Sequence, residues 1–238
     1  MTTSAAPQSL TQILEGIDAA SLCDANKRLR VLDPSIRPLG CLTRIVGRAR
    51  IVSAEDDFLP VLETLVHLGE GDVLVVAAGG RKQAFAGELF IHEAARRKLA
   101  GIVIDGGCRD TASVIKAGIP VFAKWQTPMA GTAKKPASHP DEEPVEVGGV
   151  SLRQGEIVVA DSDGIVVLTE QELNDALPIA RRIQESEAAV LEKIRAGHSL
   201  MNFLNLDEHL AKRRAGEESQ LRFHLDAQSD RTSADQAT

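Results

Sequence analysis

Two aliphatic runs joined by an amphipathic segment constrain the fold of this chain most strongly. Residues 73–78 and 101–104 are continuous aliphatic runs typical of buried strands, and residues 87–99 between them repeat apolar side chains at helical spacing. Strand, helix and strand, with a crossover of this length, predict a right-handed parallel βαβ unit. Because 43% of the residues are hydrophobic but only 3% are aromatic, the core must be built from Val, Ile, Leu and Ala.

Three charged side chains follow the second run within a few positions. Asp105, Arg109 and Asp110 stand next to Gly106 and Gly107, which we expect to form a tight turn. In α/β proteins, backbone amides and side chains converge on one crevice at such strand ends. A carboxylate beside a guanidinium suits a divalent metal ion with an anionic substrate. We therefore expect chemistry at this strand end.

The rest of the chain predicts further elements around this unit. Ser21 is expected to cap a helix, with Asp24 completing a capping box, and Gly79-Gly80 is expected to end the first run. A polar stretch without periodicity, residues 127–146, predicts a long loop. We expect helices over residues 9–18, 20–29, 59–68, 109–117, 171–197 and 200–225, strands over 43–53 and 120–125, and a hairpin-like β segment over 147–153 and 157–168.

Charge and cysteine content exclude several classes of protein. The formal net charge is −7, so we expect no nucleic-acid or membrane partner, since those need a basic face. The sequence has no run of eighteen apolar residues, so we expect no membrane-spanning helix. It has no basic segment followed by an apolar one at the N-terminus, so we expect no signal peptide. The three cysteines have neither disulfide nor zinc spacing, and no histidine pattern suggests a metal site. The sequence therefore predicts a cytoplasmic protein.

A series of short motifs in a fixed order resembles the RraA-like family. This family includes 4-hydroxy-4-methyl-2-oxoglutarate aldolases, oxaloacetate decarboxylases and a regulator of ribonuclease activity. The resemblance covers about residues 21–210. The motifs that carry it are residues 21–25, 36–39, 71–76, 87–89, 101–106, 109–110, 147–150, 155–161 and 163–167.

The resemblance implies an architecture. We expect an α/β fold with β/β/α swivelling-domain-like layers, forming a single domain over residues 1–225. Residues 171–225 are expected to be a helical C-terminal extension that packs on a neighbouring subunit, and residues 226–238 a disordered tail. The resemblance also implies a homotrimer or hexamer with sites between subunits.

The family's site pattern is an acidic residue, twenty positions, and then Arg-Asp, and here Glu88 precedes Arg109-Asp110 at that spacing. The resemblance implies that Asp110 binds Mg²⁺ or Mn²⁺ directly and that Glu88 contacts the metal through water. Arg109 and the backbone amides of Gly87, Glu88 and Leu89 are expected to bind the substrate. An acidic residue from a neighbouring subunit reaches the metal in the family's aldolases, and Glu185 is the nearest candidate.

Each of these residues also has an ordinary structural interpretation. Asp110 fits the N-cap of the helix that follows, Glu88 fits a favourable charge at a helix start, and Arg109 fits a salt bridge to a neighbouring Asp. Glu185 and the second candidate, Glu187, fit a solvated helix face.

Other polar residues near the motif have less distinctive roles. Asp105 either orients Arg109 or a metal-bound water, or caps the expected glycine turn. Lys134 and Lys135 fit either a second substrate carboxylate or a solvated charge pair. His92 and Cys108 are interpreted as structural.

The resemblance predicts a divalent-metal-dependent aldolase or decarboxylase that acts on a 2-oxo acid through a metal-stabilised enolate. Two alternatives stay open: a non-catalytic, protein-binding regulator, and another lyase or hydro-lyase on the same scaffold. The aldolase pattern usually has Asp where this chain has Glu88. The regulators have Gly at that position and an acidic residue where this chain has Ser113, which favours an enzyme.

Overall fold

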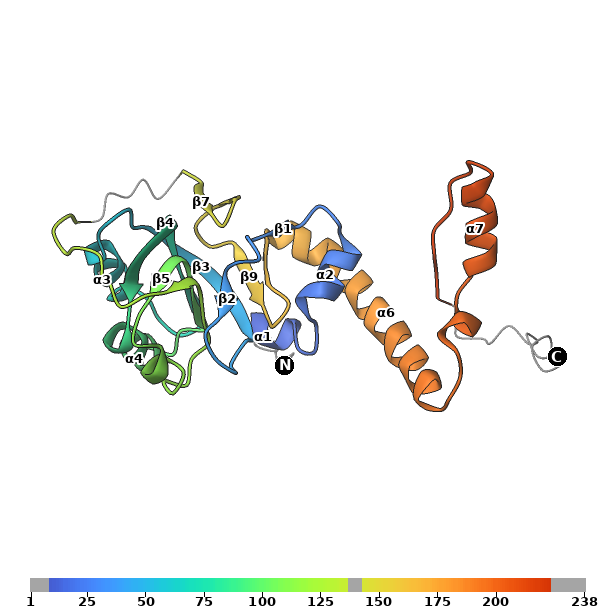
Figure 1. Ribbon diagram of the computed structural model, residues 1–238, viewed down its shortest axis with the longest axis horizontal. Helices are drawn as coiled ribbons and strands as arrows, with labels where there is room; N and C mark the ends of the chain where they lie inside the picture. Colours follow the sequence, from blue (N-terminus) through green and yellow to red (C-terminus); the bar gives the residue numbers. More distant parts are fainter. Residues whose placement is uncertain (1–8, 137–142, 224–238) are drawn as a thin grey trace, which may run out of the picture. The chain divides into compact units, whose positions relative to one another are not determined.

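The computed structural model describes residues 9–136 and 143–223 (Figure 1). Within these residues, those up to Leu177 form one compact unit and those from Pro178 onward form a second. The tail expected over residues 226–238 lies outside the described part, as do residues 137–142 of the expected loop. No helix in the described part has the length and apolar character needed to cross a membrane.

An eight-stranded mixed sheet organises the described residues of the first unit, in the order β1-β10-β9-β3-β4-β5-β6-β2. Neighbours among β3, β4, β5 and β6 pair in parallel, which confirms the expected βαβ arrangement, whereas the other pairs in the sheet are antiparallel. β7 and β8 form a separate hairpin. The strands are β1 (Arg30–Val31), β2 (Arg37–Pro38), β3 (Ile45–Ser53), β4 (Asp72–Ala86), β5 (Gly101–Cys108), β6 (Val121–Gln126), β7 (Val145–Val147), β8 (Val150–Leu152), β9 (Ile157–Ala160) and β10 (Ile165–Leu168).

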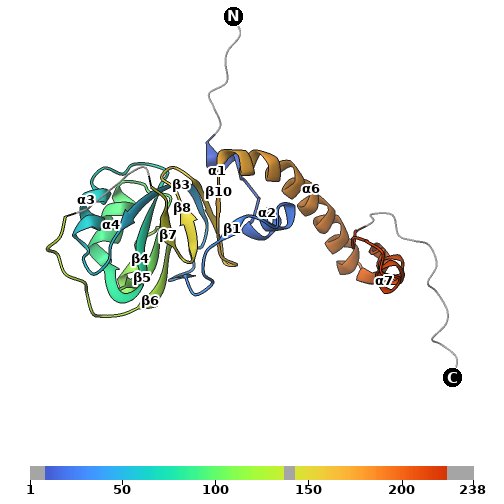
Figure 2. The same ribbon diagram turned by 90° about the horizontal axis from the view of Figure 1, so that it is seen from above.

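The strand alternation gives the sheet two apolar faces. Val52, Val76 and Ile104 are partners across β3, β4 and β5 and share a core with the helices α3 (Leu59–Leu65), α4 (Glu88–Arg96) and α5 (Thr111–Val114). Adjacent positions such as Val75 and Val103 point to the other face, where the β7–β8 hairpin covers them. Figure 2 shows α3 and α4 on one side of β4 and β5 and the hairpin on the other. The expected β/β/α layering is thus confirmed.

The glycine pairs do not form the turns expected of them. Gly79 and Gly80 have positive φ angles of 58° and 71°, but β4 continues through them with shifted register until Ala86. Gly106 and Gly107 are buried residues within β5. A Cβ on Gly107 would lie 2.5 Å from the carbonyl oxygen of Gln83, so glycine is needed there because the irregular half of β4 passes close by.

The N-terminal helices are shorter than predicted. α1 spans Leu10–Ile13 and α2 spans Ala19–Ala25. Ser21 is not the cap of α2: it lies buried within the helix, and its backbone N–H donates to the carboxylate of Asp18, the actual cap, at 2.7 Å. The capping-box interpretation is wrong because α2 already begins at Ala19, with Asp18 rather than Ser21 as its N-cap.

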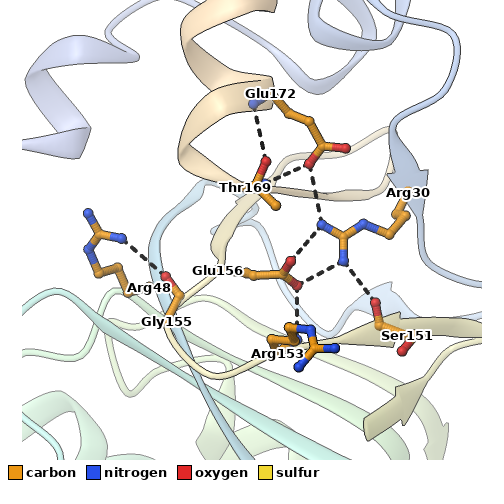
Figure 3. A network of polar contacts seen from close by, with 8 residues as sticks. All are labelled: Arg30, Arg48, Ser151, Arg153, Gly155, Glu156, Thr169 and Glu172. Atoms are coloured by element: carbon orange, nitrogen blue, oxygen red, sulfur yellow. Dashed lines mark hydrogen bonds and ion pairs between the residues drawn. The ribbon is translucent and has the colours of Figure 1, made fainter. Parts of the chain in front are cut away.

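A true capping box starts the long helix α6 (Glu170–Arg195) (Figure 3). Glu172 N donates to Thr169 Oγ1 at 3.2 Å, and Thr169 N donates to Glu172 Oε2 at 2.7 Å. Arg30 then joins this helix start to the β8–β9 turn by a bidentate pair with Glu156, both bonds being 2.8 Å, and by a contact with Glu172. These contacts fix the beginning of α6 on the first unit.

The second unit contains the rest of α6, a 3₁₀ helix at Leu200–Phe203 and α7 (Leu206–Arg214). The helix expected up to residue 225 therefore ends earlier. Gly216 has a φ of 77°, and the chain after it returns to pair near the start of α7, with Asn205 N donating to Arg222 O.

Candidate functional site

Arg109 and Asp110 lie directly after β5. Arg109 N donates to Ala86 O at 3.1 Å, which ties the end of β5 to the end of β4. Asp110 adopts a left-handed backbone conformation, with φ 56° and ψ 34°, which Asp tolerates better than most residues. Asp110 does occupy the N-cap position of α5, but its side chain makes no cap hydrogen bond to that helix.

The carboxylate of Asp110 is held at the start of α4 instead. Its Oδ2 atom accepts a hydrogen bond from Glu88 N at 3.3 Å and lies 3.3 Å from Nε of Arg109. Oδ1 takes part in neither contact. The side chains of Arg109 and Asp110 are 47% and 43% exposed, and Glu88 is also exposed, so all three are open to a ligand.

Gly87 makes this approach possible. A Cβ built on Gly87 would lie 2.6 Å from Asp110 Oδ2 and 2.9 Å from Arg109 Cγ, both closer than side-chain contacts allow. The φ of Gly87, −156°, is open to any residue, so glycine is required here by space rather than by backbone conformation. The predicted residues Gly87, Glu88, Arg109 and Asp110 thus come together at the start of α4.

Two hollows of opposite character flank this group, and Glu88, Arg109 and Asp110 line both. The first, called here the apolar hollow, has a volume of about 390 Å³ and is otherwise lined by Phe58, Ala84, Phe85, Ala86, Gly87, Leu89, Phe90 and Ala130. The second, the polar hollow, has a volume of about 980 Å³ and is otherwise lined by Cys108, Thr111, Ala112, Ser113, Gln126, Thr127 and Pro128.

The sequence alone did not point to the phenylalanines of the apolar hollow. Phe58 precedes α3 and Phe90 lies in α4, and their rings meet edge to face with centroids 5.7 Å apart. The chain has only six Phe, one Trp and no Tyr, and three of the six Phe line this one hollow. In the sequence, the small number of aromatic residues was the feature that could have drawn attention to these phenylalanines.

Asp57 is a second residue that the sequence analysis missed. It is buried, and its Oδ2 atom accepts hydrogen bonds from Thr132 Oγ1 and from the backbone N–H groups of Lys134 and Lys135 at 2.6–3.0 Å. Leu59 N donates to its Oδ1. Burial acts to raise the pKa of Asp57, but these hydrogen bonds outweigh it and hold the pKa at about 2. Asp57 thereby fixes Phe58 and the 130–135 segment, two walls of the apolar hollow.

Asp105 does not belong to this site. Its buried carboxylate accepts a hydrogen bond from Gly148 N at 2.9 Å and lies 3.6 Å from Lys124 Nζ. The expected roles of orienting Arg109 and of capping a glycine turn are wrong, because strand alternation turns Asp105 to the hairpin face. Asp105 anchors the β7–β8 hairpin instead.

Cys108 is buried beside the site, and burial raises the pKa of its thiol to about 12. A thiol held protonated in this way is a poor nucleophile, which agrees with the structural interpretation of Cys108.

The other candidate residues lie on the surface. Glu185 and Glu187 are exposed on the part of α6 that belongs to the second unit. His92 is exposed on α4 and lines neither hollow, and the side chains of Lys134 and Lys135 are exposed.

Asp110 and Glu88 are the candidate metal ligands of this site. Among the described residues, no group of three or more His, Cys, Asp and Glu side chains could hold a metal ion. Asp110 and Glu88 offer two carboxylates within one open site. A sparse oxygen set fits a hard cation such as Mg²⁺, which keeps most of its waters, and it does not fit zinc.

Comparisons with known proteins agree with this architecture. The family model described as RraA-like: Aldolase/RraA matches residues 19–167. A protein of Halalkalibacterium halodurans named "Putative 4-hydroxy-4-methyl-2-oxoglutarate aldolase" is 32% identical over 73% of this chain and 82% of its own length.

Solved structures also resemble this fold over most of the chain. An uncharacterized protein from Pseudomonas syringae superposes with a TM-score of 0.71 and 26% identity, covering 83% of this chain and 98% of the other. The Streptomyces coelicolor protein RraAS2, described as an unusual member of the RNase ES inhibitor RraA family, gives a TM-score of 0.68 and 27% identity over 80% of this chain and all of its own. The sheet and these structural matches thus define an RraA-like α/β protein. The chain belongs to the RraA-like family, of the Aldolase/RraA description.

Proposed function

We propose that this protein is a divalent-metal-dependent carbon–carbon lyase, an aldolase or decarboxylase, that acts on a 2-oxo acid. The observation that carries the proposal is the convergence of Arg109, Asp110 and the first turn of α4 between two hollows. The aldolase name of the Halalkalibacterium relative supports it.

Arg109 and the start of α4 would hold the substrate. The N-terminal turn of a helix presents backbone N–H groups without partners inside the helix, and these suit the carboxylate of a 2-oxo acid. The guanidinium of Arg109 is half exposed beside that turn, so it can donate to the keto oxygen and stabilise the negative charge that develops there.

Asp110 would bind Mg²⁺ or Mn²⁺ directly, and Glu88 would contact it through water. When bound, the cation supplies Lewis-acid stabilisation of the oxygen that becomes negative. Asp110 Oδ1 takes no part in the hydrogen bond from Glu88 N, and Gly87 leaves the space in which the carboxylate sits.

The reaction needs one proton to leave and one to return. In aldol cleavage, the C3–C4 bond breaks as the 4-hydroxyl proton departs, which gives a carbonyl product and the enolate of pyruvate. The enolate then takes a proton at C3. Glu88, exposed at the site, would hold the water that carries these protons.

The proposal includes a homo-oligomer in which the C-terminal segment packs on a neighbour and brings Glu185 to its site. Support comes from the second unit, where a hollow of about 900 Å³ is lined by exposed apolar side chains such as Leu191, Ile194 and Phe223. We also propose that the protein is cytoplasmic, where its three free cysteines would stay reduced. Light scattering tests the assembly, and Glu185→Gln tests the shared site.

The test is pyruvate release from oxaloacetate and from 4-hydroxy-4-methyl-2-oxoglutarate, with Mg²⁺ or Mn²⁺ and then with EDTA. We expect chelator-sensitive pyruvate that Asp110→Asn reduces more than 100-fold, because the amide keeps the shape but loses the charge. Asp163→Asn, at an exposed Asp in the β9–β10 turn, is the matched control. Unchanged turnover in Asp110→Asn would refute the proposal. Absence of both metal binding and pyruvate would favour a non-catalytic binding protein.

A further inference from the structure

The apolar hollow lies directly against the proposed reaction centre. Glu88, Arg109 and Asp110 line it, and every other lining residue is apolar or glycine. The hollow is open to solvent, and its enclosed part, about 80 Å³, has room for a small apolar group rather than for a whole substrate. A substrate held at Arg109 therefore has an apolar space on one side.

Two cations close to these walls in the sequence, Arg81 and Lys82, are engaged elsewhere. Arg81 Nε lies 2.7 Å from Asp56 Oδ1, and Lys82 Nζ lies 5.8 Å from the centre of the Trp125 ring. Among the residues that line the apolar hollow, Arg109 is the one cation, and the first carboxyl and keto group of the substrate would occupy it. A second substrate carboxylate placed there would lose water without gaining a partner from the lining. Burial of an unpaired charge is strongly unfavourable.

The hollow is also built before any ligand arrives. The rings of Phe58 and Phe90 fix each other, and Asp57 ties Phe58 to the 130–135 segment. Ala84 N donates to Met129 O at 2.7 Å, which holds Ala130 in place. The apolar walls are therefore positioned by contacts within the protein, so ligand binding needs to order few further groups.

We propose that the apolar hollow binds the part of the substrate beyond C3, so that the substrate is a 2-oxo acid whose C4 carries an alkyl or aryl group. This inference rests on the proposed function and narrows it. Aldol cleavage would then yield pyruvate and an apolar aldehyde or ketone: the C3–C4 bond breaks, the 4-hydroxyl proton leaves, and C3 takes a proton. The relatives' named substrate, a 4-hydroxy-2-oxoglutarate, carries a second carboxylate at that end.

Binding of two uncleavable probes tests the inference without turnover. The affinities of 2-oxo-4-phenylbutanoate and 2-oxoglutarate are measured by calorimetry on the full chain with Mn²⁺. We expect the phenyl compound to bind at least 10-fold more tightly. Equal affinity, tighter binding of 2-oxoglutarate, or binding of neither overturns the inference.

A charge placed in the hollow gives the matched comparison. In Ala130→Arg, the ratio of the affinity for 2-oxoglutarate to that for 2-oxo-4-phenylbutanoate is expected to rise at least 10-fold over wild type. The new cation would lie in the hollow, where it would pair with the second carboxylate of 2-oxoglutarate. Ala133→Arg adds the same charge to the same loop outside both hollows and should leave the ratio unchanged. A preference that both variants shift equally overturns the inference.

Cleavage assays separate this inference from the proposed function. Pyruvate from 4-hydroxy-2-oxo-4-phenylbutanoate at a higher kcat/KM than from 4-hydroxy-4-methyl-2-oxoglutarate supports both. A higher kcat/KM for 4-hydroxy-4-methyl-2-oxoglutarate supports the lyase activity but refutes the inference that the hollow binds an apolar C4 substituent. A binding preference without pyruvate from any substrate supports the apolar hollow and refutes the lyase.

Discussion

Replacement of Gly87 by Ala adds one methyl group at the centre of the site. The new Cβ would lie 2.6 Å from Asp110 Oδ2, about 0.8 Å less than the 3.4 Å at which ordinary contact begins, and 2.9 Å from Arg109 Cγ. Both side chains must therefore move away from the start of α4. Asp110 loses the hydrogen bond from Glu88 N as it moves, because that bond is already 3.3 Å long.

The expected losses of activity and stability differ widely. Displacements of about 1 Å in a catalytic group can lower rates about 100-fold, so we expect kcat/KM and Mn²⁺ affinity to fall between 10-fold and 100-fold. Folding stability should change by less than about 1 kcal/mol. The backbone of Gly87 suits Ala, the displaced side chains are half exposed, and Ala lowers the entropy of the unfolded chain.

The assay couples released pyruvate to lactate dehydrogenase, with Mn²⁺ titration and thermal unfolding on the same samples. Gly69→Ala is the matched control, because a Cβ on Gly69 meets nothing within 4 Å. Full activity and metal affinity in Gly87→Ala would refute the steric argument. An equal loss of stability and activity would show that the glycine serves folding rather than the site.

Three further predictions follow from contacts outside the catalytic group. Asp57→Asn should be less stable than wild type at pH 7. The pKa of Asp57 is about 2 in the folded protein against an ordinary 3.8, so its contribution to stability is present above pH 4 and is lost as the pH falls toward 2. The melting temperatures of wild type and Asp57→Asn should therefore converge over this range. A constant difference between them would contradict the reasoning. Arg30→Met should lower stability by about 2 kcal/mol, or ~6 °C in Tm, because Glu156, 10% exposed, loses a bidentate partner. A Tm change below 1 °C would count against this. In the native protein at pH 8, Cys108 should react with a thiol reagent far more slowly than exposed Cys41, since burial raises the pKa of Cys108 to about 12, and equal rates would contradict the burial argument.

The local pattern of the sequence predicted most elements correctly. Residues 101–104 form a buried strand, residues 87–99 contain α4, and the segment from 171 begins the long helix α6. Periodicity suffices here because an aliphatic run or an amphipathic repeat has few alternatives once the chain must bury it. The spacing between Glu88 and Arg109-Asp110 likewise indicated residues that the structure brings together: the backbone N–H of Glu88 and the side chain of Arg109 both contact Asp110.

Predictions failed where a residue's role depends on a distant segment. Gly106 and Gly107 resemble a turn locally, yet they lie in β5 because the second half of β4 packs against them. Asp105 resembles a site residue, yet it binds the hairpin 43 positions away. The role of Asp57 could not be predicted, because three of its four hydrogen-bond donors follow it by 75 to 78 positions.

The sequence by itself determined the parallel core, because local periodicity indicates which segments are buried strands and helices. The order of its short motifs indicated the family and, with it, the spacing of the acidic and basic residues of the site. Only the tertiary structure decided that Gly87 leaves room for Asp110, that Asp105 faces the opposite side, and that Phe58, Phe90 and Ala130 meet to form an apolar hollow. The physical reason is that steric fit and desolvation act between segments far apart in the chain. Which segments meet is settled by the packing of the whole sheet and its two faces.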